Sequence, residues 1–326
     1  MLVLCDDGEL LPRLAAAVER GGASAVLARD LATLTSQATR SAPLPFRFIV
    51  YGFDGGADRL RTLCQHVRPN AQLIAVVPTT TLAATIELLG DSRCNHAVVA
   101  DDIGLATISV TIGKFVSGDL FGIEKYLPKG TEVQLTRLRD YKGRTAAIDE
   151  VLSYAEKVGV RSRIRASIGQ VCEELLMNAL YDAPADEDGR PIFAEVEMKA
   201  RLERLSPRPV SIRYASTEAG FAVSVRDRFG RLDKATVLRY IDKCLHSSQQ
   251  IDRKVYGAGL GIYLIANAAT QFVINVAPGM ATEVICTFDA KGTRGLLRTV
   301  SIFLYPGAPQ AAADDAQRRG AAKRVE

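Results

Sequence analysis

The stretch EELLMNALYDAP, residues 173–184, places polar side chains inside an otherwise apolar helical run. Glu174 and Asn178 are four residues apart, so they lie on the same face of a helix, and Asp182 follows one turn later. The buried stripe of this helix is predicted at Ile164, Ile168, Val171 and Leu175. An acid and an amide beside a buried stripe suit a polar pocket, but ordinary helices carry them too. Other stretches of the sequence are needed to distinguish a polar pocket from an ordinary helix surface.

The length and composition limit the classes of protein to consider. The 326 residues are enough for two domains, and 48% hydrophobic with 24% charged residues is typical of a globular chain. A net charge of +4 gives no dense basic face for nucleic acid. No apolar run approaches the roughly 18 residues of a membrane span, and MLVLCDDGELL lacks the basic head of a secretory signal. The six cysteines are scattered, which predicts buried thiols in a cytoplasmic protein.

Residues 1–118 alternate short apolar runs with amphipathic segments. This rhythm predicts an α/β domain with five parallel strands and helices on both faces, a doubly wound (βα)5 arrangement. The predicted strands are MLVLC (1–5), SAVLA (24–28), FRFIVY (46–51), QLIAVV (72–77) and HAVVA (96–100).

This layout resembles the receiver domain of two-component response regulators. Asp6 and Asp7 match the acid pair of that family, and Thr79 or Thr80 matches its hydroxyl residue. The aspartate expected at the end of the third strand is replaced by Tyr51-Gly52, with Asp54 displaced into a loop, and no lysine follows the fifth strand. Aspartyl phosphorylation needs all these parts in register. The resemblance therefore implies a degenerate receiver that serves docking or dimerisation.

The remaining chain is divided by composition. Residues 119–144 hold mixed charges and several glycines, and we interpret them as a linker with one short element over 121–127. A second domain is predicted over 145–305, beginning with a helix over 145–159. Residues 306–326 are rich in Ala, Arg and Asp and predict a disordered tail.

Two further motifs lie in this second domain. The strand in AVSVRDRFGRL ends at Asp227, and Gly230 follows three residues later. A carboxylate at a strand end before a glycine turn can accept the exocyclic amine of a purine, although D-x-x-G is also a frequent turn sequence. In YGAGLGIYLIANAA, Gly257, Gly259 and Gly261 precede an apolar helix, so their N–H groups suit a phosphate chain. No GK[ST] follows, which excludes a Walker loop.

The order EELLMNA, DRFG, GAGLG and then GMATEVICTF resembles the boxes of the GHKL ATPase superfamily over residues 145–290. The family resemblance implies an α/β two-layer sandwich that binds ATP with Mg²⁺. The short second glycine box is most similar to the anti-sigma-factor serine kinase branch. Histidine kinases carry a phosphorylatable histidine on paired helices, and none of His66, His96 and His246 lies in such a helix.

The resemblance implies a role for each matching residue. Asn178 would hold the Mg²⁺ that bridges the phosphates, and Glu174 would act as the catalytic base. Asp227 would accept the adenine amine, Gly230 would let the base approach, and Thr282 would contact the adenine side. The further nucleotide-binding residues implied are Asp182, Lys254, Gly257, Gly259, Leu260 and Gly261. Residues 231–256 would form the ATP lid, with Arg253 and Lys254 toward the γ-phosphate. The segment 183–209 is longer than this branch normally has.

The resemblance implies a signalling protein that phosphorylates a serine or threonine of a partner regulator, or sequesters that regulator in an ATP-dependent way. The implied partner is a sigma factor, an anti-anti-sigma-like protein or a phosphotransfer protein, without nucleic acid or membrane. A homodimer is compatible with the receiver-like domain. Two alternatives stay open: a non-catalytic ATP-dependent switch, and a histidine-kinase-like ATPase acting on a separate phosphotransfer protein.

Overall fold

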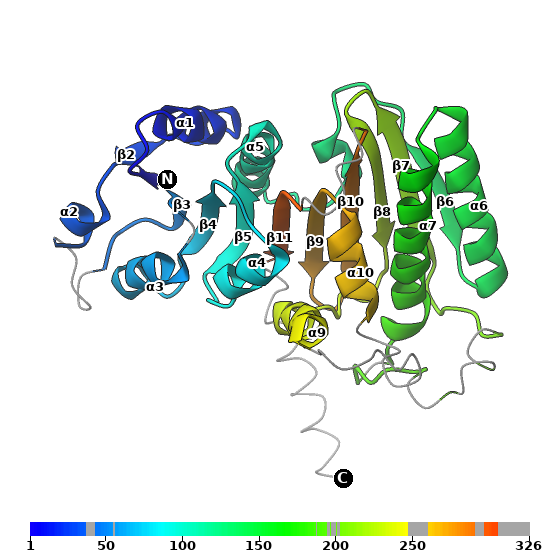
Figure 1. Ribbon diagram of the computed structural model, residues 1–326. Coiled ribbons are helices and arrows are strands. Elements are labelled where there is room, and N and C mark those ends of the chain that lie inside the picture. The colour runs from blue at the N-terminus through cyan, green and yellow to red at the C-terminus, as the bar shows by residue number, and fades with distance from the viewer. Residues whose placement is uncertain are drawn as a thin grey trace, which may run out of the picture.

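The structure is a computed structural model that describes residues 1–36, 43–54, 56–186, 188–193, 196, 200, 203–246, 260–290 and 297–305. Its strands are β1 (Leu2–Cys5), β2 (Val26–Ala28), β3 (Phe48–Gly52), β4 (Gln72–Val77), β5 (Cys94–Val99), β6 (Gln134–Leu138), β7 (Val210–Thr217), β8 (Gly220–Arg226), β9 (Gln271–Ala277), β10 (Ala281–Asp289) and β11 (Thr299–Leu304). Within the described ranges they form one mixed sheet with the order β2-β1-β3-β4-β5-β11-β9-β10-β8-β7-β6 (Figure 1).

Helices cover both faces of this sheet. They are α1 (Leu10–Arg20), α2 (Leu31–Ser36), α3 (Ala57–His66), α4 (Leu82–Leu89), α5 (Asp102–Ser117), the 3₁₀-helix η1 (Ile123–Tyr126), α6 (Tyr141–Lys157), α7 (Ser162–Met177), the π-helix η2 (Asn178–Asp182), α9 (Lys234–His246) and α10 (Leu260–Ala268). None of the helices in the described part combines the length and apolar character that crossing a membrane requires.

The first five strands are all parallel, which confirms the five parallel strands predicted within residues 1–118. β4 and β5 are buried along almost their whole length because helices cover both of their faces, and this explains their continuous apolar runs. α1 and α5 pack on one face, and α3 and α4 pack on the other.

The strands β6 to β10 form an antiparallel region, with α6, α7 and α10 packed on one face (Figure 1). The opposite face of this region is covered by the chain around η1, where Leu120 and Ile123 pack on β8, β9 and β10. β7 shows the alternating burial expected of an antiparallel strand, because its two faces meet different environments.

β11 joins the two regions into one sheet. It pairs in parallel with β9 and antiparallel with β5, so the last described strand of the chain lies between the two predicted domains. The apolar core also continues from α3 and α4 to α6, α7 and α10. The two regions are therefore not separate packing units.

The predicted linker differs from what the structure contains. Besides η1, residues 119–144 hold β6, an edge strand that pairs with β7. α6 also begins earlier than predicted, at Tyr141, where the Asp140 carboxylate caps the helix by accepting a hydrogen bond of 2.7 Å from the Gly143 N–H. The sequence looks loose here because β6 is a short edge strand with alternately exposed side chains.

A buried polar network fastens α5 to the antiparallel region. The Lys114 ammonium, 1% exposed, donates to the Tyr126 hydroxyl at 2.8 Å and to Asn275 Oδ1 at 2.9 Å. Asn275 donates in turn to Glu283 Oε2 at 3.0 Å, which also accepts from the Gly122 N–H at 2.8 Å. Burial lowers the pKa of Lys114 to about 7, although the Glu283 charge opposes this shift.

The acids that the receiver resemblance singles out in residues 1–118 (the receiver-like region below) have partners from their own chain. Arg59 of α3 forms ion pairs with Asp6 at 3.1 Å and with Asp54 at 3.4 Å. Asp7 accepts the N–H groups of Glu9 and Leu10. The guanidinium thus lies where these carboxylates converge, and a degenerate receiver stays the prediction for this region.

The thiols of Cys5, Cys64, Cys94, Cys172 and Cys286 are free and buried, as predicted.

Candidate functional site

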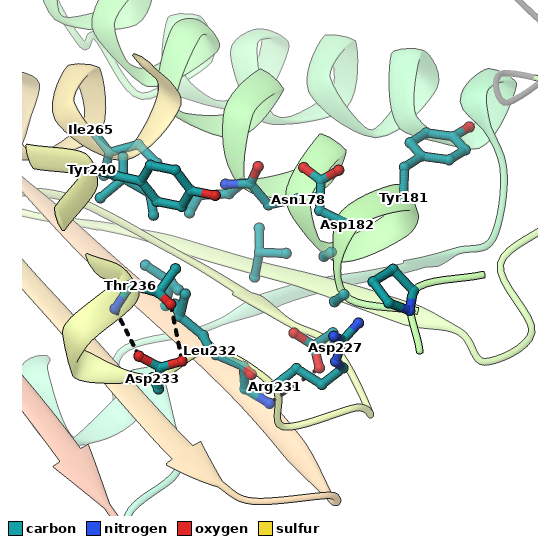
Figure 2. A pocket seen from close by; sticks show the side chains of 18 of the residues that line it. Asn178, Tyr181, Asp182, Asp227, Arg231, Leu232, Asp233, Thr236, Tyr240 and Ile265 are labelled. Atoms are coloured by element: carbon teal, nitrogen blue, oxygen red, sulfur yellow. Dashed lines mark hydrogen bonds between the residues drawn. The ribbon is translucent and has the colours of Figure 1, made fainter. Parts of the chain in front are cut away.

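A cavity of about 570 Å³ lies between the helical layer and the antiparallel strands, a volume typical of small-molecule sites. Its walls come from α7 and η2, the ends of β8 and β10, α9 and α10, and they include the predicted site residues Asn178, Asp182, Asp227 and Thr282. Figure 2 shows Asn178 and Asp182 on the helical side and Asp227 across the cavity from them. Three segments about 50 residues apart in sequence, around residues 178–182, 227 and 282, therefore line one cavity.

A change of helix type positions Asn178. α7 ends at Met177, and the next turn, Asn178–Asp182, is a π-helix. The wider turn differs from the regular helix expected through residue 182, and such π turns occur frequently at functional sites. Asn178 is half-buried and Asp182 is exposed at the cavity mouth, so both amide and carboxylate are accessible to a ligand.

Asp227 follows the end of β8 and is 6% exposed. Its Oδ1 accepts three backbone N–H groups, from Phe229 at 2.7 Å, Gly230 at 3.2 Å and Thr282 at 3.3 Å. Burial raises the pKa of this carboxyl, while the three N–H donors act in the opposite direction. Because all three backbone bonds use Oδ1, they fix the orientation of the carboxylate, and Asp227 lines the cavity.

Gly230 is required by the backbone at this turn. Its φ of +64° lies in the left-handed region, and a Cβ there would overlap the Ala277 carbonyl oxygen and approach the Ala281 nitrogen to 2.9 Å. The glycine thus lets the loop after β8 pack against the β9–β10 turn. The structure thus shows Gly230 allowing two backbone segments to approach each other. That it also lets an adenine ring approach stays a prediction.

Thr282 lies in β10 beside Asp227 and is 4% exposed. Its carbonyl accepts the Asp227 N–H at 2.9 Å. Its hydroxyl is buried and makes no hydrogen bond of good geometry within the described residues, although the side chain lies close enough to the Asp227 carboxyl to favour its charged form. Buried hydroxyls are normally satisfied, so this group is suited to a polar atom of a ligand or to a bridging water.

Glu174 lies one turn before Asn178 but does not line the cavity itself. Its carboxylate packs against Gly261 in the first turn of α10, where a Cβ would overlap Glu174 Oε2. Burial raises the pKa of Glu174, and the charges of Glu173 and Asp182 raise it further. A half-buried carboxyl with a raised pKa has one property of a general base.

α9 supplies cavity residues that the sequence interpretation did not assign. Thr236, Arg239 and Tyr240 of this helix line the cavity, together with Arg231 and Leu232 just before it. Figure 2 shows the Tyr240 hydroxyl pointing toward Asn178. The amphipathic pattern of residues 234–246 predicts a helix, but the pattern does not tell which partner each face meets.

Part of the predicted phosphate site lies outside the described residues. This applies to Lys254, Gly257 and Gly259, and also to the side chain of Leu260, the first residue of α10. Across the described ranges, no group of three or more His, Cys, Asp or Glu side chains could hold a metal ion by itself. The side chains that line the cavity fit Mg²⁺ only as part of a metal–phosphate complex, because Mg²⁺ accepts one or two protein oxygens, phosphates and water. The Asn178 amide oxygen is suited to that part.

Comparison with known proteins identifies no family. No family model matches the chain, and no curated protein matches it. Among solved structures, it is similar to a chain in the crystal structure of the SiaB–SiaC complex from Pseudomonas aeruginosa, with 13% sequence identity and a TM-score of 0.33. The match covers 48% of this chain and 88% of the other. A likeness at this TM-score supports no conclusion on fold or function.

Proposed function

We propose that residues 145–305 are an ATP-binding domain of the GHKL type, a two-layer α/β sandwich, and that residues 1–118 are a receiver-like regulatory domain. The protein would use ATP with Mg²⁺ in the cytoplasm to phosphorylate a serine or threonine of a partner regulator. The observation that carries this proposal is the Asp227 carboxylate, held by three N–H donors through one oxygen, across one cavity from the Asn178 amide.

Each wall would contact a different part of the nucleotide. Asp227 Oδ2 would accept the adenine amine, and the buried Thr282 hydroxyl would meet a polar atom of the base. Apolar side chains for the ring are available at Ile262 and Ile265 of α10. Asn178, with Asp182 beside it, would bind on the metal and phosphate side.

The chemistry rests on Glu174. When bound, ATP–Mg²⁺ supplies the γ-phosphoryl group. Glu174 would orient the acceptor hydroxyl of the partner and take its proton, for which the raised pKa of its carboxyl is suited. The packing of Gly261 against this carboxylate would hold it in position. A simple binding switch needs Asn178 and Asp227 but has no use for a base.

Binding is tested first, by calorimetry with ATP and Mg²⁺. The wild type should bind, and Asn178→Ala should lose binding because the metal–phosphate complex loses its amide ligand. The matched control is Asn267→Ala, since Asn267 is an exposed amide on α10 that does not line the cavity. Unchanged affinity in Asn178→Ala would contradict the metal role.

Transfer is tested with γ-labelled ATP in a cell lysate. Acid-stable label on a protein, absent with Glu174→Gln and present with the exposed control Glu19→Gln, would support a serine or threonine kinase. Acid-labile label would instead support transfer to a histidine. Binding without transfer would leave the ATP-dependent switch as the function.

A further inference from the structure

Helix α9 contacts three parts of the molecule at once. It packs against α4 of the receiver-like region and against α10 of the antiparallel region (Figure 1). It also forms one wall of the cavity. Val237 and Ile241, one turn apart, are completely buried and fix the helix in the core. A displacement of α9 therefore changes the shape of the cavity.

The first residue of α9 is fastened to the receiver-like region. The Lys234 ammonium donates to the backbone carbonyls of Asp91 at 2.7 Å and Cys94 at 2.8 Å, in the turn that leads into β5. Hydrogen bonds from a charged donor are stronger than neutral ones. Lys234 is thus a direct polar link between this turn and the cavity wall.

The turn that receives Lys234 is itself ordered by ionic contacts. The Asp91 carboxylate accepts from Arg93 Nε at 2.9 Å and from its second guanidinium nitrogen at 2.8 Å. The same guanidinium donates to the carbonyl of Cys64, next to the end of α3. The position of Lys234 is therefore set by α3 and β5 of the receiver-like region.

The cavity side of α9 begins two residues later. Thr236 is held by Asp233, which accepts the Thr236 N–H at 2.7 Å and its hydroxyl at 3.0 Å (Figure 2). Tyr240, one turn further, points toward Asn178. Since Lys234, Thr236 and Tyr240 belong to one short helix, a shift at Lys234 is transmitted to the side chains that face the ligand.

We propose that Lys234 is a positioning residue through which the receiver-like region fixes the α9 wall of the nucleotide cavity. Affinity for ATP then depends on the turn Asp91–Cys94, and by thermodynamic reciprocity ATP stabilises that turn. This inference rests on the proposed function, because it takes ATP–Mg²⁺ as the ligand of the cavity. It gives the receiver-like region a route to the site that needs no phosphorylation of its acids.

The first test measures ATP–Mg²⁺ affinity by calorimetry on the full chain. Lys234→Met should weaken binding by about fivefold or more, the lower end of typical coupling between sites. Lys234→Arg should restore most of the affinity, because a guanidinium can also donate to two carbonyls. The control Lys142→Met removes an exposed lysine of α6 and should bind like the wild type. Unchanged or tighter binding by Lys234→Met overturns the proposal.

The second test needs no variant and uses hydrogen exchange of the wild type with and without ATP–Mg²⁺. The Cys94 N–H donates to the same Asp91 carbonyl that accepts from Lys234, so its exchange should slow when ATP binds. Amides of β1, remote from α9, serve as the control. Unchanged exchange at Cys94 in a protein that binds ATP overturns the coupling and leaves the proposed function intact. A wild type without ATP affinity overturns both. If Lys234→Met does not fold, this measurement alone decides.

Discussion

Replacing Asp227 with asparagine tests the adenine contact without disturbing the loop that holds it. The asparagine Oδ1 can accept the same three N–H groups, and those donors fix which way the amide points. The amide nitrogen must then take the place of Oδ2, where it presents a donor to the donor amine of adenine. The lost hydrogen bond to a charged acceptor contributes about 1.5–3 kcal/mol, so ATP affinity should fall by roughly 10- to 100-fold.

The same variant should fold at least as well as the wild type. Burial raises the pKa of Asp227 above its ordinary value of 3.8, so the folded protein holds the proton more tightly than the unfolded chain. The wild type therefore loses stability as the pH rises from that ordinary value through the raised one, and asparagine removes this loss. Asp227→Ala is the contrast, because it leaves three buried N–H groups without their acceptor and should lower the free energy of unfolding by about 2 kcal/mol or more.

Calorimetric titration with ATP–Mg²⁺ and urea denaturation at neutral pH separate the two effects. The expected result for Asp227→Asn is native stability with weak binding. Native stability with native affinity would refute the assignment of Asp227 to the adenine amine. A large loss of stability would refute the inference that the three backbone N–H groups on Oδ1 are what hold this side chain.

Three further changes test other parts of the structure. Gly261→Ala should displace the Glu174 carboxylate and slow phosphoryl transfer by roughly 100-fold. The control is Gly169→Ala on α7, where a Cβ meets Leu152 at an ordinary 3.4 Å, and it should not slow transfer. Equal transfer rates in the two variants would contradict the contact between Gly261 and Glu174. The transfer rate of the wild type should keep rising above pH 4.5, the ordinary pKa of glutamate. Glu174 must lose its proton to act as the base, and its pKa is raised above that value. A pH–rate profile already flat at pH 4.5 would count against Glu174 as the base. The free energy of unfolding should rise between about pH 7 and 10.5. The reason is that Lys114 has a pKa of about 7 in the folded protein and of 10.5 in the unfolded chain, so the unfolded chain holds the proton in this range. Urea denaturation at both pH values should show a smaller rise in Lys114→Met.

The sequence predicts local structure well where one pattern dominates. The runs that became β1, β3, β4 and β5 were recognisable because strands buried on both faces are continuously apolar. β2 is an exposed edge strand, and only its short apolar run marked it. The polar residues of the cavity were recognisable because Asp227 follows directly after a strand and Asn178 interrupts an apolar helix. Both are local signals.

Long-range pairing was not predictable in the same way. The run that formed β11 indicates a strand, but its insertion between β5 and β9 depends on two edges that the chain itself does not mark. The link from Lys234 to two backbone carbonyls has no side-chain partner that a motif could reveal. The π turn at Asn178 has no local signal either, since Asn178-Ala-Leu-Tyr-Asp carries no residue that excludes an ordinary helix.

The position of β11 has a consequence for biosynthesis. β5 is complete once residue 99 is made, but its open side faces a strand encoded some 200 residues later, at 299–304. Until that strand leaves the ribosome, β5 and β9 each present a free row of backbone donors and acceptors, which is the kind of edge that recruits foreign strands. The nascent chain is therefore prone to aggregation through its open strand edges during much of its synthesis. Truncation before residue 299 should yield protein that associates with itself.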